Sequence, residues 1–157
     1  MSVKAIPDGY HTTTPYLVVR DANQAIEFYK SAFGAVERGR LAMPDGTVMH
    51  GEFQVGDSFI MYCEENPDMG MQGPQSTGGS GVTLCLYVED VDAVFNQAIS
   101  SGAESIYPVE DQFWGDRAGT LVDPFGHRWM VMTHIENVEW DEIERRFNQM
   151  YLDSQQG

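Results

Sequence analysis

The sequence contains few cysteines and no long apolar run. Its two cysteines, Cys63 and Cys85, are too few for a disulfide framework, and both lie in apolar, strand-like segments, so we expect buried free thiols. No apolar stretch is long enough to cross a bilayer, and the N-terminus lacks the basic and then apolar pattern of a signal peptide. These absences favour a cytoplasmic protein that does not act at a membrane.

Basic residues are also scarce. Nine Lys and Arg stand against 24 Asp and Glu, which gives a formal net charge of −15. Such an acidic chain is poorly suited to bind nucleic acid or anionic membrane surfaces, and we interpret the charge as a solvated surface that maintains solubility. The length of 157 residues and the apolar fraction of 42% fit one domain with a hydrophobic core.

The chain repeats itself once. LVVRDA at 17–22 resembles LYVEDV at 86–91, an offset of 69, and GDSFIMY at 56–62 resembles GHRWMVM at 126–132, an offset of 70. An amphipathic pattern follows the first member of each pair, and a further strand pattern precedes the second. Each half is therefore predicted to run strand, helix, strand, strand, strand.

The boundaries of the two helices can also be predicted. Asp21 and Asp90 are suitable N-caps, and Gly34 and Gly102 are suitable stops. The halves are joined by 65–81, which is rich in Gly, Pro and Ser and is expected to be a loop without a long helix.

A separate helix is predicted at the C-terminal end, over 137–151, with Asn137 as its cap. Its apolar residues fall at spacings of three and four and form one stripe: Trp140, Ile143, Phe147 and Met150. We expect this stripe to be buried, either on the domain itself or on a second subunit.

Alternation along the strands predicts that each sheet has two unlike faces. In the strand 47–55, His50, Glu52 and Gln54 share one face, while the other face is apolar. After the loop, Leu84 and Leu86 are expected to pack under the helices. Two sheets whose mixed faces looked toward each other would enclose a largely apolar cavity with a few polar groups, which is typical of a small-molecule site.

These segments resemble a known family. LVVRDANQAIEFYKSAFGA, VMHGEFQVGDSFIMY and FWGDRAGTLVDPFGHRWMVMTHIENV look like the vicinal oxygen chelate superfamily, which includes glyoxalase I, bleomycin resistance proteins and extradiol dioxygenases. The PhnB-like branch is the most similar. The resemblance implies an α+β fold: two βαβββ modules, 12–64 and 81–136, in one domain over 12–136, followed by the helix 137–151. It also implies a homodimer that binds its ligand on concave sheet faces.

The resemblance further implies where a metal would be held in the metal-using members. Carried onto this sequence, the ligand positions are Thr14 and Thr83 on the first strands and Ile60 and Met130 on the last strands. None of these residue types is a usual ligand of a divalent ion. We therefore expect no metal and no cofactor, and the alternative is a displaced metal site.

Two pairs of residues are candidates for chemistry or binding. His50 and Glu52 can form an acid/base pair or part of a displaced metal site, but a half-buried structural pair explains them as well. Arg117 can hold an anion and Trp114 can stack on a flat ligand, whereas the alternative is a turn with a packed indole. Further residues expected to line the cavity are Tyr62, Thr83, Tyr87 and Met130.

Two functions follow from these features. The first is a small-molecule binding protein of the bleomycin resistance kind, which needs a cavity and no catalytic set. The second is a lyase, isomerase or transferase that uses His50 and Glu52, with or without a displaced divalent metal. Whether the protein is an enzyme is left open by the sequence, because one fold supports many chemistries.

Overall fold

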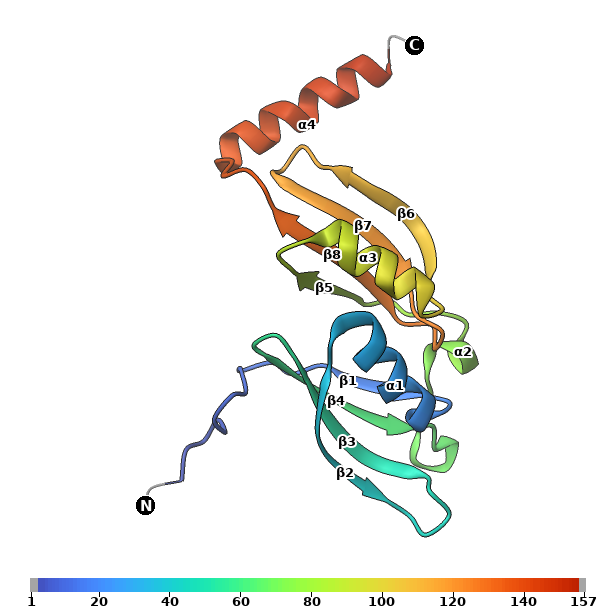
Figure 1. Ribbon diagram of the computed structural model, residues 1–157. Helices are drawn as coiled ribbons and strands as arrows, with labels where there is room; N and C mark the ends of the chain where they lie inside the picture. The colour runs from blue at the N-terminus through green and yellow to red at the C-terminus, as the bar shows by residue number, and fades with distance from the viewer. Residues whose placement is uncertain (1–2, 156–157) are drawn as a thin grey trace.

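The computed structural model describes residues 3–155 and contains two four-stranded sheets, each with a helix on one face (Figure 1). In the first sheet the strand order is β1-β4-β3-β2. The strands of this sheet are β1 (Tyr16–Val19), β2 (Val36–Ala42), β3 (Val48–Val55) and β4 (Ser58–Glu64). Helix α1 (Ala22–Phe33) connects β1 to β2.

The second sheet repeats this arrangement with the order β5-β8-β7-β6. Its strands are β5 (Thr83–Tyr87), β6 (Glu104–Asp111), β7 (Asp116–Val122) and β8 (Arg128–His134). Helix α3 (Val91–Ser100) connects β5 to β6. In both sheets the first and last strands pair in parallel and the other pairs are antiparallel, so the predicted pair of βαβββ modules is confirmed.

Helix boundaries agree with the capping residues seen in the sequence. Asp21 accepts a hydrogen bond from the Gln24 amide at 2.9 Å, and Asp90 accepts one from the Ala93 amide at 3.0 Å. Gly34 ends α1 with a φ of 68°, which favours glycine. The loop between the modules carries only two short helical segments, η1 (Pro67–Met69) and α2 (Pro74–Thr77).

The two modules share one hydrophobic core. Helix α1 lies beside α3, and Tyr29 of α1 stacks on Phe53 of the first sheet at 4.9 Å between ring centroids. The same ring lies 5.7 Å from Trp129 of the second sheet. Because the helix-covered faces meet in this core, the two open sheet faces point away from it. The open faces of one chain therefore do not enclose a cavity between them.

The C-terminal helix α4 (Trp140–Ser154) has Glu139 at its N-cap, two residues after the predicted cap Asn137. None of its residues is buried, and it extends away from the sheets (Figure 1). Its attachment to the domain includes Arg146, which donates to Glu136 at 2.7 and 2.9 Å. Phe147 lies 5.9 Å from Phe113 between ring centroids, but Phe147 and Trp140 are exposed, so the domain covers the predicted apolar stripe only in part.

Two further expectations concern burial and membranes. Cys63 is buried as predicted, but Cys85 is exposed because it lies on the open face of β5. Among residues 3–155, no helix is long and apolar enough to span a membrane.

Candidate functional site

The open face of the first sheet carries a continuous hydrogen-bonded chain of four side chains. The Tyr16 hydroxyl lies 2.9 Å from His50 Nδ1, and His50 Nε2 lies 3.2 Å from Glu52 Oε1. The other oxygen of Glu52 accepts a hydrogen bond from Tyr10. His50 and Glu52 therefore lie together on one face of β3, as the sequence predicts, and two tyrosines complete the group.

The surroundings of Glu52, Tyr10 and Tyr16 shift the pKa of each of these three groups. Hydrogen bonds from Tyr10 and then His50 lower the pKa of Glu52, so it remains a carboxylate near neutral pH. Burial, together with the Glu52 carboxylate, raises the pKa of Tyr10 to about 12. Burial also raises the pKa of Tyr16. Both tyrosines are therefore neutral hydroxyl donors.

Tyr10 is a member of this group that sequence reasoning missed. It lies before β1 in a segment without regular secondary structure, where no strand or helix period indicates a partner. Its ring stacks on Phe59 of β4 with 4.5 Å between centroids, which holds the N-terminal segment against the open face. Only the tertiary packing of this segment brings the hydroxyl to Glu52.

The open face of the second sheet is organised around the carboxylate of Asp116. Its side chain is 5% exposed and accepts hydrogen bonds from Tyr87 at 2.9 Å and Trp114 at 3.0 Å. On the other oxygen, His134 Nδ1 lies at 2.8 Å. One buried charge thus fixes the orientation of three side chains that lie on or beside the open face.

His134 connects this network to the chain beyond β8. Its Nε2 lies 2.9 Å from Asn137 Oδ1, so an acceptor stands at each ring nitrogen. Asn137 and then Asp116 raise the pKa of His134, because both hydrogen bonds favour the imidazolium. Asn137 therefore holds His134 instead of capping α4.

A hollow of about 250 Å³ opens beside this network, over β6, β7 and β8. Two aromatic rings, Trp114 and Tyr107, and the carboxylate of Glu110 contribute to its wall, with Gln112, Thr120 and Met130. A smaller hollow of about 150 Å³ lies where the modules meet, and Thr14, Cys85 and Ile60 are among its lining residues. Both are concave and contain few polar groups, as small-molecule sites do.

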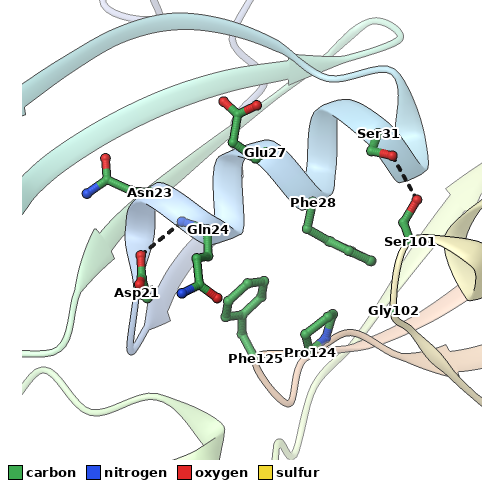
Figure 2. Close-up of a pocket in the computed structure, with 10 residues that line it drawn as sticks. All are labelled: Asp21, Asn23, Gln24, Glu27, Phe28, Ser31, Ser101, Gly102, Pro124 and Phe125. Atoms are coloured by element: carbon green, nitrogen blue, oxygen red, sulfur yellow. Dashed lines mark hydrogen bonds between the residues drawn. The ribbon is translucent and has the colours of Figure 1, made fainter.

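A wider hollow of about 770 Å³ lies on the helix side of the molecule (Figure 2). Figure 2 shows that Asp21 there caps α1 and that Ser31 and Ser101 bond to each other across the two modules. Phe28 and Phe125 at its wall belong to the shared core. Because these groups already serve the fold, we place the candidate site on the open faces.

Of the residues predicted to line the cavity, Thr83, Tyr87 and Met130 lie on the open face of the second sheet. Tyr62 does not. It pairs with Leu17 and Gly51 on the helix side of the first sheet, and it is fully buried. The expectation that Tyr62 lines the cavity is therefore wrong: its strand neighbour Met61, which pairs with Tyr16, lies on the open face, and Tyr62 points the opposite way.

Arg117 also lies on the helix side, and it is not brought together with Trp114. Its guanidinium donates to both oxygens of Asp92 at 2.8 Å and to Asp111 at 2.9 Å. These pairs tie α3 and β6 to β7. The expectation that Arg117 holds an anionic ligand is corrected by this geometry, because each of its three nitrogens already donates to a carboxylate of the chain.

Comparison with known proteins adds the family. Residues 10–131 match the model of the Glyoxalase/Bleomycin resistance protein/Dioxygenase superfamily. The chain belongs to this superfamily. The resemblance found in the sequence, which rested on the βαβββ repeat and on quoted segments that include the DPFG turn at 123–126, is thereby confirmed.

Individual members of the glyoxalase/bleomycin resistance superfamily resemble the chain over most of its length. Protein Rv0887c of Mycobacterium tuberculosis, which is uncharacterised, is 43% identical over 134 residues, 83% of this chain and 79% of that protein. The X-ray structure of the Arabidopsis thaliana product At5g48480 has a TM-score of 0.64 and 31% identity, covering 77% of this chain and 97% of the other. A PhnB protein from Bacillus cereus, at 19% identity and a TM-score of 0.63, covers 78% and 99% and supports the fold alone.

The positions that the resemblance gives for metal ligands in this superfamily need one correction. Ile60 pairs with Phe53 and faces the helices, whereas Met130 lies on the open face. Met130 pairs with Cys85 of β5, and Met61 pairs with Tyr16, the equivalent residue of β1. The residue that corresponds to Met130 is therefore Met61. Within residues 3–155, no group of three or more His, Cys, Asp and Glu is placed to hold a metal ion. Threonine and methionine at these positions do not fit a divalent metal.

Proposed function

We propose that this chain is a small-molecule binding protein that holds its ligand against the open sheet faces, with a second copy closing the cavity. The observation that carries this proposal is the shared core of the two modules. It buries both helix-covered faces and leaves both polar and aromatic faces open on one chain.

The exposure of aromatic side chains on these faces supports a covering partner. Tyr87 is 61% exposed and Tyr107 is 64% exposed, and they lie in the two edge strands of the second sheet, β5 and β6. A face that is rich in exposed aromatic residues usually marks an interaction surface. A homodimer in which two open faces approach each other would bury them and enclose a ligand.

The second sheet offers the more complete set of ligand contacts. Trp114 is held by Asp116 at the wall of the 250 Å³ hollow, and Met130 and Thr120 contribute to the same wall. Side chains that are fixed before binding lose little freedom when a ligand arrives. We assign the main ligand contacts to this face, with Thr83 and Tyr87 at its β5 edge.

Native mass spectrometry of the purified protein tests this function. We expect a dimer that carries an organic mass, which is lost on denaturation and in Trp114→Ala. Trp140→Ala is the matched control, because it removes an exposed indole from α4, outside the hollow. A monomer without such a mass, or equal retention of the mass in the two variants, would contradict the proposal.

A second candidate function is supported by the hydrogen-bonded side chains on the open face of the first sheet. Glu52, His50 and Tyr16 are arranged as carboxylate, imidazole and hydroxyl, with distances of 3.2 and 2.9 Å. If His50 carries its proton on Nε2 and donates it in the hydrogen bond to Glu52, then Nδ1 is free to accept the Tyr16 proton. Tyr16 would exchange a proton with a substrate while His50 holds or returns it, as a lyase or isomerase requires.

Exchange of solvent deuterium into 2-oxo and 2-hydroxy carbonyl compounds, followed by NMR, tests the enzyme function. We expect exchange with the natural protein and with His11→Ala, an exposed histidine outside the chain of hydrogen bonds. We expect no exchange with His50→Ala. Exchange that persists in His50→Ala would exclude His50 as the base.

A further inference from the structure

The hollow on the second sheet has a wall chemistry that selects for charge. Two aromatic residues, Trp114 and Tyr107, and one acidic residue, Glu110, line it. No Lys or Arg is among the residues that line it in the described part of the chain. An aromatic face attracts a cation through its quadrupole, and a nearby carboxylate adds a direct charge interaction.

Trp114 is held in place for such a contact by Asp116. Its indole nitrogen donates to Asp116 Oδ2 at 3.0 Å, and this carboxylate is nearly fully buried. The hydrogen bond fixes the orientation of the indole ring. Because the N–H group points at a carboxylate, it is polarised so that the ring gains electron density. Tryptophan is the aromatic side chain that binds cations best.

Glu110 has a carboxylate that is available to a ligand because no other side chain is bonded to it in the described part of the chain. It is exposed, and within residues 3–155 its carboxylate forms neither a salt bridge nor a side-chain hydrogen bond. Its neighbour Asp111, by contrast, is already paired with Arg117. The formal net charge of −15 adds a long-range field that favours the approach of cations.

We propose that this hollow binds an organic cation, with an ammonium group over Trp114 and Glu110 as its counter-charge. The inference rests on the proposed binding function and names the chemical class of its ligand. An anionic ligand is disfavoured, because Arg117, the cation expected to receive it, lies on the opposite face and is paired with Asp92.

Calorimetry with three probes that share a benzyl group and differ in charge tests the proposal: benzyltrimethylammonium, benzyl alcohol and phenylacetate. We expect the ammonium probe to bind about tenfold tighter than the alcohol, in line with a desolvated cation–π contact, and phenylacetate to bind most weakly. Glu110→Gln should reduce the affinity for the ammonium probe and leave that for the alcohol unchanged. Asp68→Asn, which removes the same charge from the exposed η1 segment, is the control and should change neither affinity.

The outcomes separate this inference from the function on which it rests. If the alcohol binds as tightly as the ammonium probe, or if Glu110→Gln and Asp68→Asn behave alike, the cation assignment is overturned while binding at this face stands. If none of the probes binds, the cation assignment is also overturned. The binding function itself is then judged by the organic mass that the native dimer carries.

Discussion

The Tyr29 hydroxyl donates a hydrogen bond of 2.8 Å to Asp123 Oδ2, and so joins the first helix of one module to the last turn of the other. Asp123 also accepts from the Trp129 indole at 2.9 Å and from the amides of Phe125 and His127, each at 2.9 Å. All four donors converge on one buried carboxylate. The DPFG turn is therefore a structural joint, and the open faces depend on it for their relative position.

Tyr29→Phe should destabilise the protein without changing its fold. The variant removes one donor from a buried carboxylate, which costs about 1–3 kcal/mol of unfolding free energy. Urea denaturation followed by circular dichroism measures the loss. Tyr107→Phe is the matched control, since its hydroxyl belongs to an exposed side chain and should change stability by less than about 0.5 kcal/mol. Equal stabilities of the two variants would refute the role given to the Tyr29–Asp123 bond.

Gly51→Ala should also be destabilising, because of the ring that lies over it. A Cβ at Gly51 would meet the buried Tyr62 ring at 2.3 Å, so the ring or the strand must shift. Overpacking of this kind costs about 1–3 kcal/mol, which thermal denaturation detects. Gly39→Ala on the neighbouring strand provides the control, since nothing lies within 4 Å of its Cβ position. A Gly51→Ala variant as stable as Gly39→Ala would show that the Tyr62 ring is not fixed in this place.

The fold was predictable because periodicity and capping act locally. Which residues of β4 point to the open face was not predictable. Aligning Gly56 with Gly126 gives an offset of 70, but the first strands repeat at an offset of 69. The structure explains the difference, because the turns before the last strands differ in length: residues 56–57 separate β3 from β4, whereas residues 123–127 separate β7 from β8. Gly56 and Gly126 are therefore not at equivalent positions. A slip of one residue moves each side chain of a strand to the other face, which is why Ile60 and Tyr62 were misplaced.

The candidate site was only partly predictable for a related reason. His50 and Glu52 alternate within one strand, so their shared face follows from the sequence. Tyr10 reaches Glu52 from 42 residues away, and Asp116 collects His134 and Tyr87 from two other strands. Such pairs are decided by register and by loop packing, for which a single sequence carries no local signal.

Tyr10→Phe should raise the pKa of Glu52, since it removes the largest cause of the lowered value and keeps the stacking on Phe59. A carboxylate with a lowered pKa in the folded state stabilises the protein above its unfolded pKa, and this contribution is lost as the pH falls through the folded pKa. The variant should thus lose at most about 1 kcal/mol at neutral pH and converge with the natural protein in acid. Carbon NMR titration of the Glu52 carboxyl group measures the shift directly.

Tyr16→Phe is the control for this titration, because Tyr16 contacts His50 and not Glu52. Its effect on the pKa of Glu52 should be smaller than that of Tyr10→Phe. If Tyr10→Phe leaves the titration of Glu52 unchanged, Tyr10 is not a partner of this carboxylate in solution.

Asn137→Ala should lower the pKa of His134. The structure places an acceptor at each ring nitrogen, and Asn137 is the larger of the two causes that raise the pKa above the ordinary value of 6.5. For a histidine with a raised folded pKa, the added stability is fully present below the unfolded pKa and is lost as the pH rises through the folded pKa. Loss of Asn137 should therefore weaken the protein at pH values below about 6.5 and have little effect well above the folded pKa. Proton NMR titration of the His134 ring in the variant and in the natural protein reports the change. A His134 titration that does not move would mean that Asn137 does not hold the imidazolium.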